Sequence, residues 1–202
     1  MSIEYDFGGG LVADPLAALE EGQGADVRIR GYHQGVITWD TQATVASVIE
    51  DFARWCALDV VDLWSPPESI LRWLHHGEDA VREEALRAMV ALGPLREKPG
   101  GGRASASSLS AWSAARWTFY GPSKSPSAAR LARGLKHFRS AAQGADQQAW
   151  ETTWGAQRAE LERRLAVAMR PQSVNERLSL HRQARYESWP QAWIDALSLD
   201  DD

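Results

Sequence analysis

The sequence predicts a mainly α-helical protein, a multi-helix bundle or an irregular helical array with a small N-terminal β-hairpin. Three observations predict this fold class. From residue 41 onward, apolar residues recur with the 3.6-residue period of amphipathic helices. Proline and glycine pairs divide that stretch into pieces of helical length. Only residues 26–39 alternate apolar and polar side chains as strands do.

Residues 1–40 are predicted to form a short helix and a hairpin that lean on the helical remainder. Asp14 is a suitable N-cap, Pro15 suits the first helical position, and Gly22 ends the helix. The stretch DVRIRGYHQGVITW then predicts two strands around a glycine-bearing turn. Four residues are expected to face one another across this hairpin: Val27, Ile29, Val36 and Thr38.

The first helical half, residues 41–96, opens with the clearest amphipathic pattern in the chain. A helix capped by Asp40 or Thr41 is expected to run to about Trp64. Its apolar face comprises eight residues: Val45, Val48, Ile49, Phe52, Trp55, Cys56, Val60 and Leu63.

Two shorter helices are predicted to follow in this half. Ser65 is expected to cap the first, with Pro66 at its first position and Glu68 completing a capping box. This helix should end at Gly77, and the next should run from about residue 79 to residue 92.

Residues 97–108, EKPGGGRASASS, predict a flexible linker. It could separate two domains, but we favour a loop within a single domain that spans 1–202. The second helical half is therefore expected at 109–202. Its predicted helices cover residues 108–120, 125–138, 146–169 and 173–186, followed by a last turn or two around Trp193.

Composition restricts the classes of function. Cys56 is the single cysteine, which excludes an internal disulfide and a cysteine-based zinc site. No secretory signal and no apolar run of membrane-spanning length is visible, so we expect a cytoplasmic protein without a membrane partner. The ten tryptophans predict either a bulky core, the default interpretation, or an aromatic recognition surface.

The net charge of −5 hides an asymmetry between the two halves of the chain. Residues 1–98 hold 17 acidic and 8 basic side chains, whereas residues 99–202 hold 10 acidic and 14 basic ones. Such a division can steer partners of either sign. It can equally reflect two parts of one fold that attract each other, and we favour that second interpretation.

Two charged sets are candidate binding surfaces. Acidic residues that lie mostly opposite the apolar helix stripes predict a docking face for a basic protein: Glu50, Asp51, Asp59, Asp62, Glu78 and Asp79. Basic residues in the segment 116–139 offer an alternative contact for phosphate or nucleic acid: Arg116, Arg130, Arg133, Lys136 and Arg139. The acidic whole chain and the absence of a nucleic-acid-binding motif weigh against the second interpretation.

No motif predicts catalysis, a metal or a cofactor. His75 and His76 are adjacent, so on a helix their rings point about 100° apart, unlike the i, i+4 pair of a zinc helix. Cys56 falls on an apolar helix face, where a thiol behaves as a small hydrophobe. The glycine runs at 8–10 and 100–102 do not fit a phosphate-binding loop.

Two segments carry a family resemblance: FARWCALDVVDLW and PPESILRWLHHGEDAVREEALRAM. An aromatic helix with an embedded cysteine, a Trp-Leu helix that ends in Gly-acidic, and an Arg/Ala helix resemble alanine- and tryptophan-rich helical proteins of high-GC bacteria and phages. Immunity proteins of bacterial polymorphic toxin systems are among them. The resemblance covers residues 50–92 and, more loosely, 141–185, and it implies a non-catalytic protein that binds another protein.

The leading hypothesis is therefore a protein-binding module, of immunity or antitoxin type, that blocks a basic partner through its acidic helical face. A nucleic-acid-binding or phage/host assembly protein that uses residues 116–139 is the first alternative. An enzyme whose site leaves no linear motif is the second.

Overall fold

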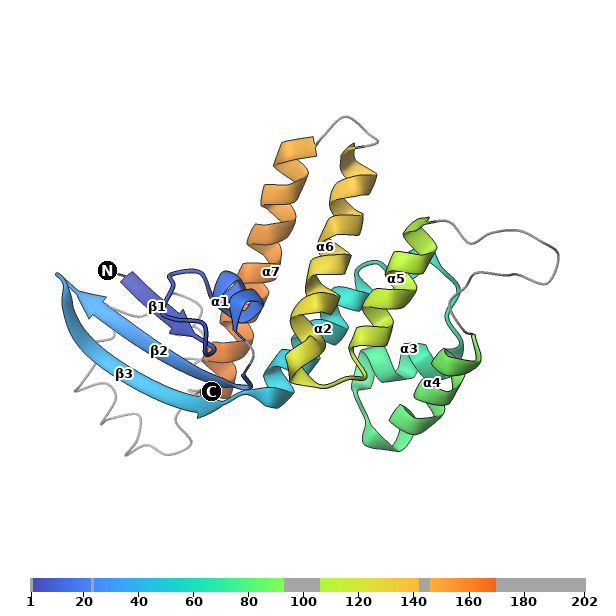
Figure 1. Cartoon of the computed structure of the whole chain (residues 1–202), viewed down its shortest axis with the longest axis horizontal. Helices are drawn as coiled ribbons and strands as arrows, with labels where there is room; N and C mark the ends of the chain where they lie inside the picture. The colour runs from blue at the N-terminus through green and yellow to red at the C-terminus, as the bar shows by residue number, and fades with distance from the viewer. Residues whose placement is uncertain (1, 23, 93–105, 142–145, 170–202) are drawn as a thin grey trace, which may run out of the picture. The chain divides into compact units, whose positions relative to one another are not determined.

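The computed structural model describes residues 2–22, 24–92, 106–141 and 146–169. It confirms a mainly helical fold with a small N-terminal antiparallel sheet (Figure 1). The chain divides into two compact units, which we call unit 1 (Met1–Val48 with Arg158–Asp202) and unit 2 (Ile49–Gln157). That residues 1–202 form one domain stays a prediction.

The sheet of unit 1 has three strands, one more than the predicted hairpin. β1 (Ser2–Asp6), β2 (Asp26–His33) and β3 (Val36–Thr44) are antiparallel in the order β1-β2-β3. The β2–β3 hairpin is confirmed, and its two turn residues have positive φ, 50° at Gln34 and 80° at Gly35. This left-handed pair matches the twist of a tight two-residue hairpin.

The predicted pairing inside the hairpin is wrong. Val27 lies opposite Ala43 and Ile29 opposite Thr41, rather than opposite Val36 and Thr38. The tight turn sets the register, because it places Val36 beside the last residue of β2 and carries β3 five residues beyond the predicted end of the strand.

The predicted helix start at Asp40 or Thr41 is wrong for the same reason. Both residues belong to β3, where Asp40 accepts hydrogen bonds from Arg28 (Nη2, 2.7 Å) and Arg30 (Nε, 2.9 Å). These guanidinium groups lower the pKa of Asp40 to about 2. The helical period begins only with α2 (Ala46–Leu58).

The predicted short helix is confirmed as α1 (Pro15–Glu21). The Asp14 carboxylate accepts hydrogen bonds from the backbone amides of Leu16 (2.8 Å) and Ala17 (3.3 Å). Pro15 occupies the first helical position, and Gly22 ends the helix. The buried side chains of unit 1 include Phe7, just after β1, and five from the sheet and α1: Tyr5, Leu16, Leu19, Val27 and Ile29.

Helix α2 stops six residues before the predicted end at Trp64. The adjacent β-branched residues Val60 and Val61 disfavour the helix, and Val60 has φ −127°. The chain then makes a short 3₁₀ helix, η1 (Val61–Leu63).

Helices α3 (Glu68–His76) and α4 (Asp79–Ala91) form a helical hairpin. The predicted cap at Ser65 is wrong, because Pro67 is the N-cap and no side chain bonds the first turn. The helical conformation is disfavoured for a residue that precedes a proline. Pro66 precedes Pro67, so the helix does not begin at Pro66. Gly77 ends α3 at φ 64° as predicted, where a Cβ would overlap the Arg54 guanidinium.

Two further helices pack on each other: α5 (Ala106–Trp117) and α6 (Ser125–Ala141), joined through the 3₁₀ helix η2 (Pro122–Lys124). Small fully buried residues allow a close approach of their backbones: Ala111, Ala114 and Ala115 on α5, and Ala128, Ala129 and Ala132 on α6. The predicted helices at 108–120 and 125–138 are thereby confirmed within a few residues.

The last described helix is α7 (Asp146–Ala168), close to the predicted 146–169. The predicted helix at 173–186, the turn around Trp193 and most of the predicted loop at 97–108 lie outside the described residues. Residues 106–108, the end of that loop, belong to α5 instead. Within the described ranges, no helix has both the length and the hydropathy needed to cross a membrane.

The described tryptophan side chains divide between the core and its margin. Trp64, Trp73 and Trp112 are buried, in agreement with the core interpretation. The side chains of Trp55, Trp117, Trp150 and Trp154 are half-buried.

Candidate functional site

The structure brings the predicted acidic and basic sets together at one place in unit 2. Lys136 Nζ on α6 donates to Asp59 at 2.6 Å, just after the end of α2. One helical turn further along α6, Arg139 Nη1 lies 3.2 Å from an Asp62 carboxylate oxygen in η1. The two acids are three residues apart in the sequence, and so are the two bases, so the two ion pairs form a short ladder.

This ladder changes what those four residues can do. All four side chains are at least one-third exposed, so each pair contributes at most about 1 kcal/mol to stability. Their charges are nevertheless balanced inside the fold. Asp59 and Asp62 therefore offer little net negative charge to a partner, and Lys136 and Arg139 little net positive charge.

Arg133 is the third member of the predicted basic set, and it is buried. Its side chain is only 1% exposed. The guanidinium lies 4.9 Å from the ring centroid of Trp150 and 4.3 Å from that of Trp154, while Nη1 donates to Gln157 Oε1 at 3.0 Å. Cation–π contact and a buried hydrogen bond give this residue a packing role between α6 and the first half of α7.

The remaining two basic candidates, Arg116 and Arg130, contact other residues than those of the ladder. Arg116 lies over the rings of Trp112 (5.3 Å) and Tyr120 (5.7 Å) and donates from Nε to the Tyr120 hydroxyl at 3.1 Å. Arg130 is exposed on α6 and lines a pocket against α5. The five predicted phosphate contacts thus do not form one open cationic stripe.

Two members of the acidic set lie on α2. Asp51 forms an ion pair with Arg54 one turn later, and Arg54 in turn lies 5.0 Å above the Trp73 ring. Glu50 is half-buried, and a Cβ at Gly121 would lie 3.7 Å from its Oε1. Asp51 is therefore compensated within the fold, like Asp59 and Asp62.

Trp73 packs between helices and also contacts an arginine of α4. Arg82 on α4 lies 5.7 Å from the Trp73 ring and donates to the Phe119 carbonyl at 2.8 Å. The indole N–H of Trp73 donates to Thr118 Oγ1 at 2.9 Å, and its ring stacks on Phe119 at 5.2 Å. The Arg82 guanidinium is thus engaged by Trp73 and Phe119, although the residue as a whole is exposed.

The other two predicted acidic residues lie at the start of α4. Glu78 is the N-cap position of α4 and Asp79 its first residue, and both are exposed. The buried stripe of this helix is Val81, Ala85 and Met89. At about 100° per residue, four residues share the side opposite Val81, and we call them the α4 stripe: Asp79, Glu83, Leu86 and Val90.

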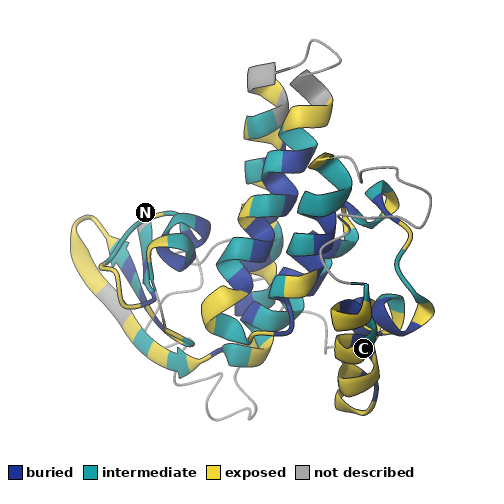
Figure 2. Cartoon of the chain, turned by 45° about the vertical axis from the view of Figure 1, so that its right-hand side comes forward, coloured by how far each residue is buried: buried dark blue, intermediate teal, exposed yellow. Residues whose placement is uncertain are grey.

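The α4 stripe combines acid and aliphatic surface. Val90 is 71% exposed and Leu86 36% exposed, although both are large apolar residues. The stripe lies on a helix that is exposed over most of its circumference (Figure 2). Neither Asp79 nor Glu83 forms an ion pair with any residue that the structure describes.

Sequence reasoning missed Glu83, Leu86 and Val90. The signal was present, because these three and Asp79 follow the i, i+4, i+7, i+11 spacing of one helix face. A second, buried stripe on the same helix concealed it. Only the structure shows which of the two apolar stripes of α4 is covered.

The structure also places the residues considered for chemistry. His75 and His76 are exposed at the end of α3, with ring centroids 6.0 Å apart. Cys56 is fully buried. Among the described residues, no three His, Cys, Asp or Glu side chains converge as metal ligands.

Comparison with known protein families, with curated proteins and with solved structures finds no match to this chain.

Proposed function

We propose that this protein is a non-catalytic protein-binding module that docks a basic protein on the α4 stripe. The exposure of Val90 and Leu86 beside Asp79 and Glu83 on one helix face carries the proposal. An exposed aliphatic patch next to a rim of one charge is typical of protein interaction sites.

The charges around α4 select the partner. Glu78 and Glu84 are exposed and extend the acidic surface beyond the stripe. Both arginines of this helix, Arg82 and Arg87, are exposed, but the Arg82 guanidinium is engaged by Trp73 and the Phe119 carbonyl. A basic surface with apolar side chains at its centre complements this arrangement, and the charges would speed its association.

The resemblance of residues 50–92 to immunity proteins supports a more specific form of the proposal. In this form the basic partner is a toxin domain, and binding in the cytoplasm blocks its action. The α4 helix lies wholly within the segment that carries the resemblance.

Site-specific photo-crosslinking in the native cells tests the proposal. A benzoylphenylalanine at Val90 should yield a discrete covalent adduct, and the adduct partner should be a basic protein. The matched control is the same crosslinker at Val36, a comparably exposed valine (66%) at the start of β3. The control position should yield no such adduct.

The purified partner must then bind the purified chain. Complex formation should weaken as salt rises, because salt screens the attraction between the opposite charges. It should be lost in the double variant Asp79→Lys/Glu83→Lys, because the reversed charges repel a basic partner. An acidic partner, equal adducts at both positions, or binding that the double variant retains would each contradict the proposal.

A further inference from the structure

A pocket of about 390 Å³ lies between α5 and α6, within unit 2 and apart from the α4 stripe. This volume falls within the range of small-molecule sites. Nine residues line it: Ala106, Ser107, Ser110, Ser127, Arg130, Leu131, Gly134, Leu135 and Phe138. None of them bears a carboxylate.

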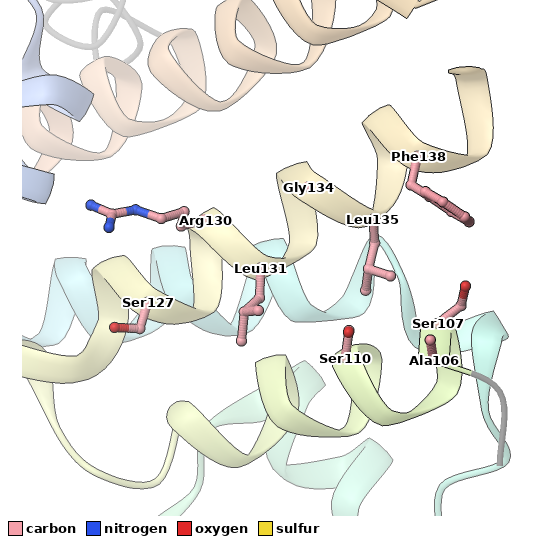
Figure 3. Close-up of a pocket in the computed structure, with 9 residues that line it drawn as sticks. All are labelled: Ala106, Ser107, Ser110, Ser127, Arg130, Leu131, Gly134, Leu135 and Phe138. Carbon is pink, nitrogen blue, oxygen red and sulfur yellow. The ribbon is translucent and has the colours of Figure 1, made fainter. Parts of the chain in front are cut away.

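The two walls of the pocket differ in chemistry. Leu131, Leu135 and Phe138 extend from α6 toward α5, and Ser107 and Ser110 extend from α5 toward them (Figure 3). Phe138 is 66% exposed, so one end of the pocket presents an aromatic ring that the fold does not cover. A ligand between the helices would therefore meet the apolar groups of α6 opposite the hydroxyls of α5, with Ser127 as a further hydroxyl on α6.

The hydroxyl groups are available for a ligand. Ser107, Ser110 and Ser127 are half-buried, and none of them hydrogen-bonds to another residue in the described ranges. Neighbouring serines behave differently: Ser108 donates to the Leu63 carbonyl and Ser113 to that of Leu109, both at 2.8 Å. Three hydroxyls that line the pocket are thus free to bond a ligand.

Gly134 points to a role for the empty space. It lies in the interior of α6, where glycine is the least favourable residue apart from proline. A Cβ at this position would meet nothing within 4 Å, and its φ is not in the left-handed region, so neither packing nor backbone geometry requires glycine here. Its missing side chain keeps the pocket open.

We propose that this pocket binds an uncharged, largely apolar small molecule that carries an aromatic or alicyclic ring and a hydroxyl or amide group. The ring packs against Leu131, Leu135 and Phe138, and the polar group bonds the serine hydroxyls. The ligand is uncharged because no carboxylate lines the pocket and the Arg130 guanidinium runs away from Leu135 and Phe138 (Figure 3).

The test is a titration of the ¹⁵N-labelled full chain with 2-naphthol, followed by amide chemical shifts. The shifts should saturate, with a dissociation constant of about 1 mM or tighter. The largest changes should lie at Ser110, Leu131 and Gly134.

Pocket-filling variants make the test specific. Gly134→Leu should weaken 2-naphthol binding by at least about tenfold, because the new side chain occupies the ring site. Ser110→Leu fills the same pocket from the other wall and guards against a folding defect in the first variant. The matched control is Gly155→Leu: this residue is an exposed helical glycine on α7 whose Cβ also meets nothing within 4 Å. It should change the affinity by less than about twofold.

Each other outcome would overturn the proposal. Shifts that do not saturate, or that spread over all exposed apolar residues, would show an unspecific probe. Equal affinity in the Gly134 and Gly155 variants would place 2-naphthol elsewhere. A wild-type dimer that Gly134→Leu dissociates, without 2-naphthol binding, would assign the groove to a second copy of the chain.

Discussion

Two acidic regions of unit 2 look alike in sequence and differ in the fold. Asp59 and Asp62, near the end of α2, are met by Lys136 and Arg139 at the same three-residue spacing. Asp79 and Glu83, on α4, have no such partners in the described chain, and the nearby Arg82 guanidinium contacts Trp73 and the Phe119 carbonyl instead. Acidic character therefore marks a docking surface only where the fold does not supply the counter-charge.

The helix pairs of unit 2 also differ in how their helices pack. The α5–α6 pair packs through small buried alanines, whereas the α3–α4 hairpin depends on one large side chain, Trp73. This ring stacks on Phe119, contacts the guanidinium groups of Arg54 and Arg82, and bonds Thr118 through its indole N–H. We expect mutations at Trp73 to affect the α4 region first.

The largest expected effect is that of Trp73→Ala. Loss of this buried indole should lower the free energy of unfolding by about 3–5 kcal/mol, because a cavity forms and the Thr118 hydroxyl loses its donor. Urea denaturation followed by circular dichroism measures the change. Trp117→Ala, at a half-buried tryptophan, is the control and should cost clearly less. Equal losses would mean that Trp73 is not the anchor.

An intermediate effect is expected from charge reversal at the ion-pair ladder. Asp59→Lys/Asp62→Lys removes two ion pairs and sets four cations together, so the free energy of unfolding should fall by about 1–2 kcal/mol at low salt. Adding Lys136→Glu/Arg139→Glu should restore most of that loss.

The same reversal on α4 provides the matched comparison. Asp79→Lys/Glu83→Lys changes the net charge by the same amount, yet it should alter the free energy of unfolding by less than about 0.5 kcal/mol. A loss as large as that of the Asp59/Asp62 variant would show that the α4 acids are also compensated within the fold.

A further small effect concerns Asp40 in unit 1, whose pKa of about 2 reflects its bonds to Arg28 and Arg30. Because the folded pKa lies below the unfolded value of about 3.9, the carboxylate stabilises the fold above that value, and the contribution disappears as the pH falls through about 2. Asp40→Asn should therefore cost at most about 1 kcal/mol at neutral pH and nothing at the acid end. The measurement is the free energy of unfolding of both proteins across this pH range. A loss that is independent of pH would contradict the ion-pair explanation.

Local signals in the sequence predict much of the fold. Asp14, Pro15 and Gly22 delimit α1, and Gly77 ends α3, because each of these residues acts on the backbone within one turn. The wrong predictions concern features that depend on contacts between residues far apart in the sequence. Asp40 remains in β3 because two arginines of the neighbouring strand meet it, and this register follows from the turn at Gln34–Gly35.

The candidate site shows the same limit. Glu78 and Asp79 could be named from the sequence, but not their difference from Asp59 and Asp62, since that depends on a helix 77 residues further along the chain. Arg133 is predicted to contact phosphate because basic residues recur every three positions on α6. That spacing does not reveal the indoles of Trp150 and Trp154, which lie against its guanidinium. Charge patterns give the candidates, and tertiary packing separates open charges from compensated ones.

The most direct test compares association rates for the two reversed pairs, with the purified partner identified by crosslinking at Val90. At low salt, Asp79→Lys/Glu83→Lys should slow association by at least about tenfold. Asp59→Lys/Asp62→Lys, with the same change in net charge, should change it by less than about twofold. If both variants slow association equally, or the second slows it more, the docking face does not lie on α4.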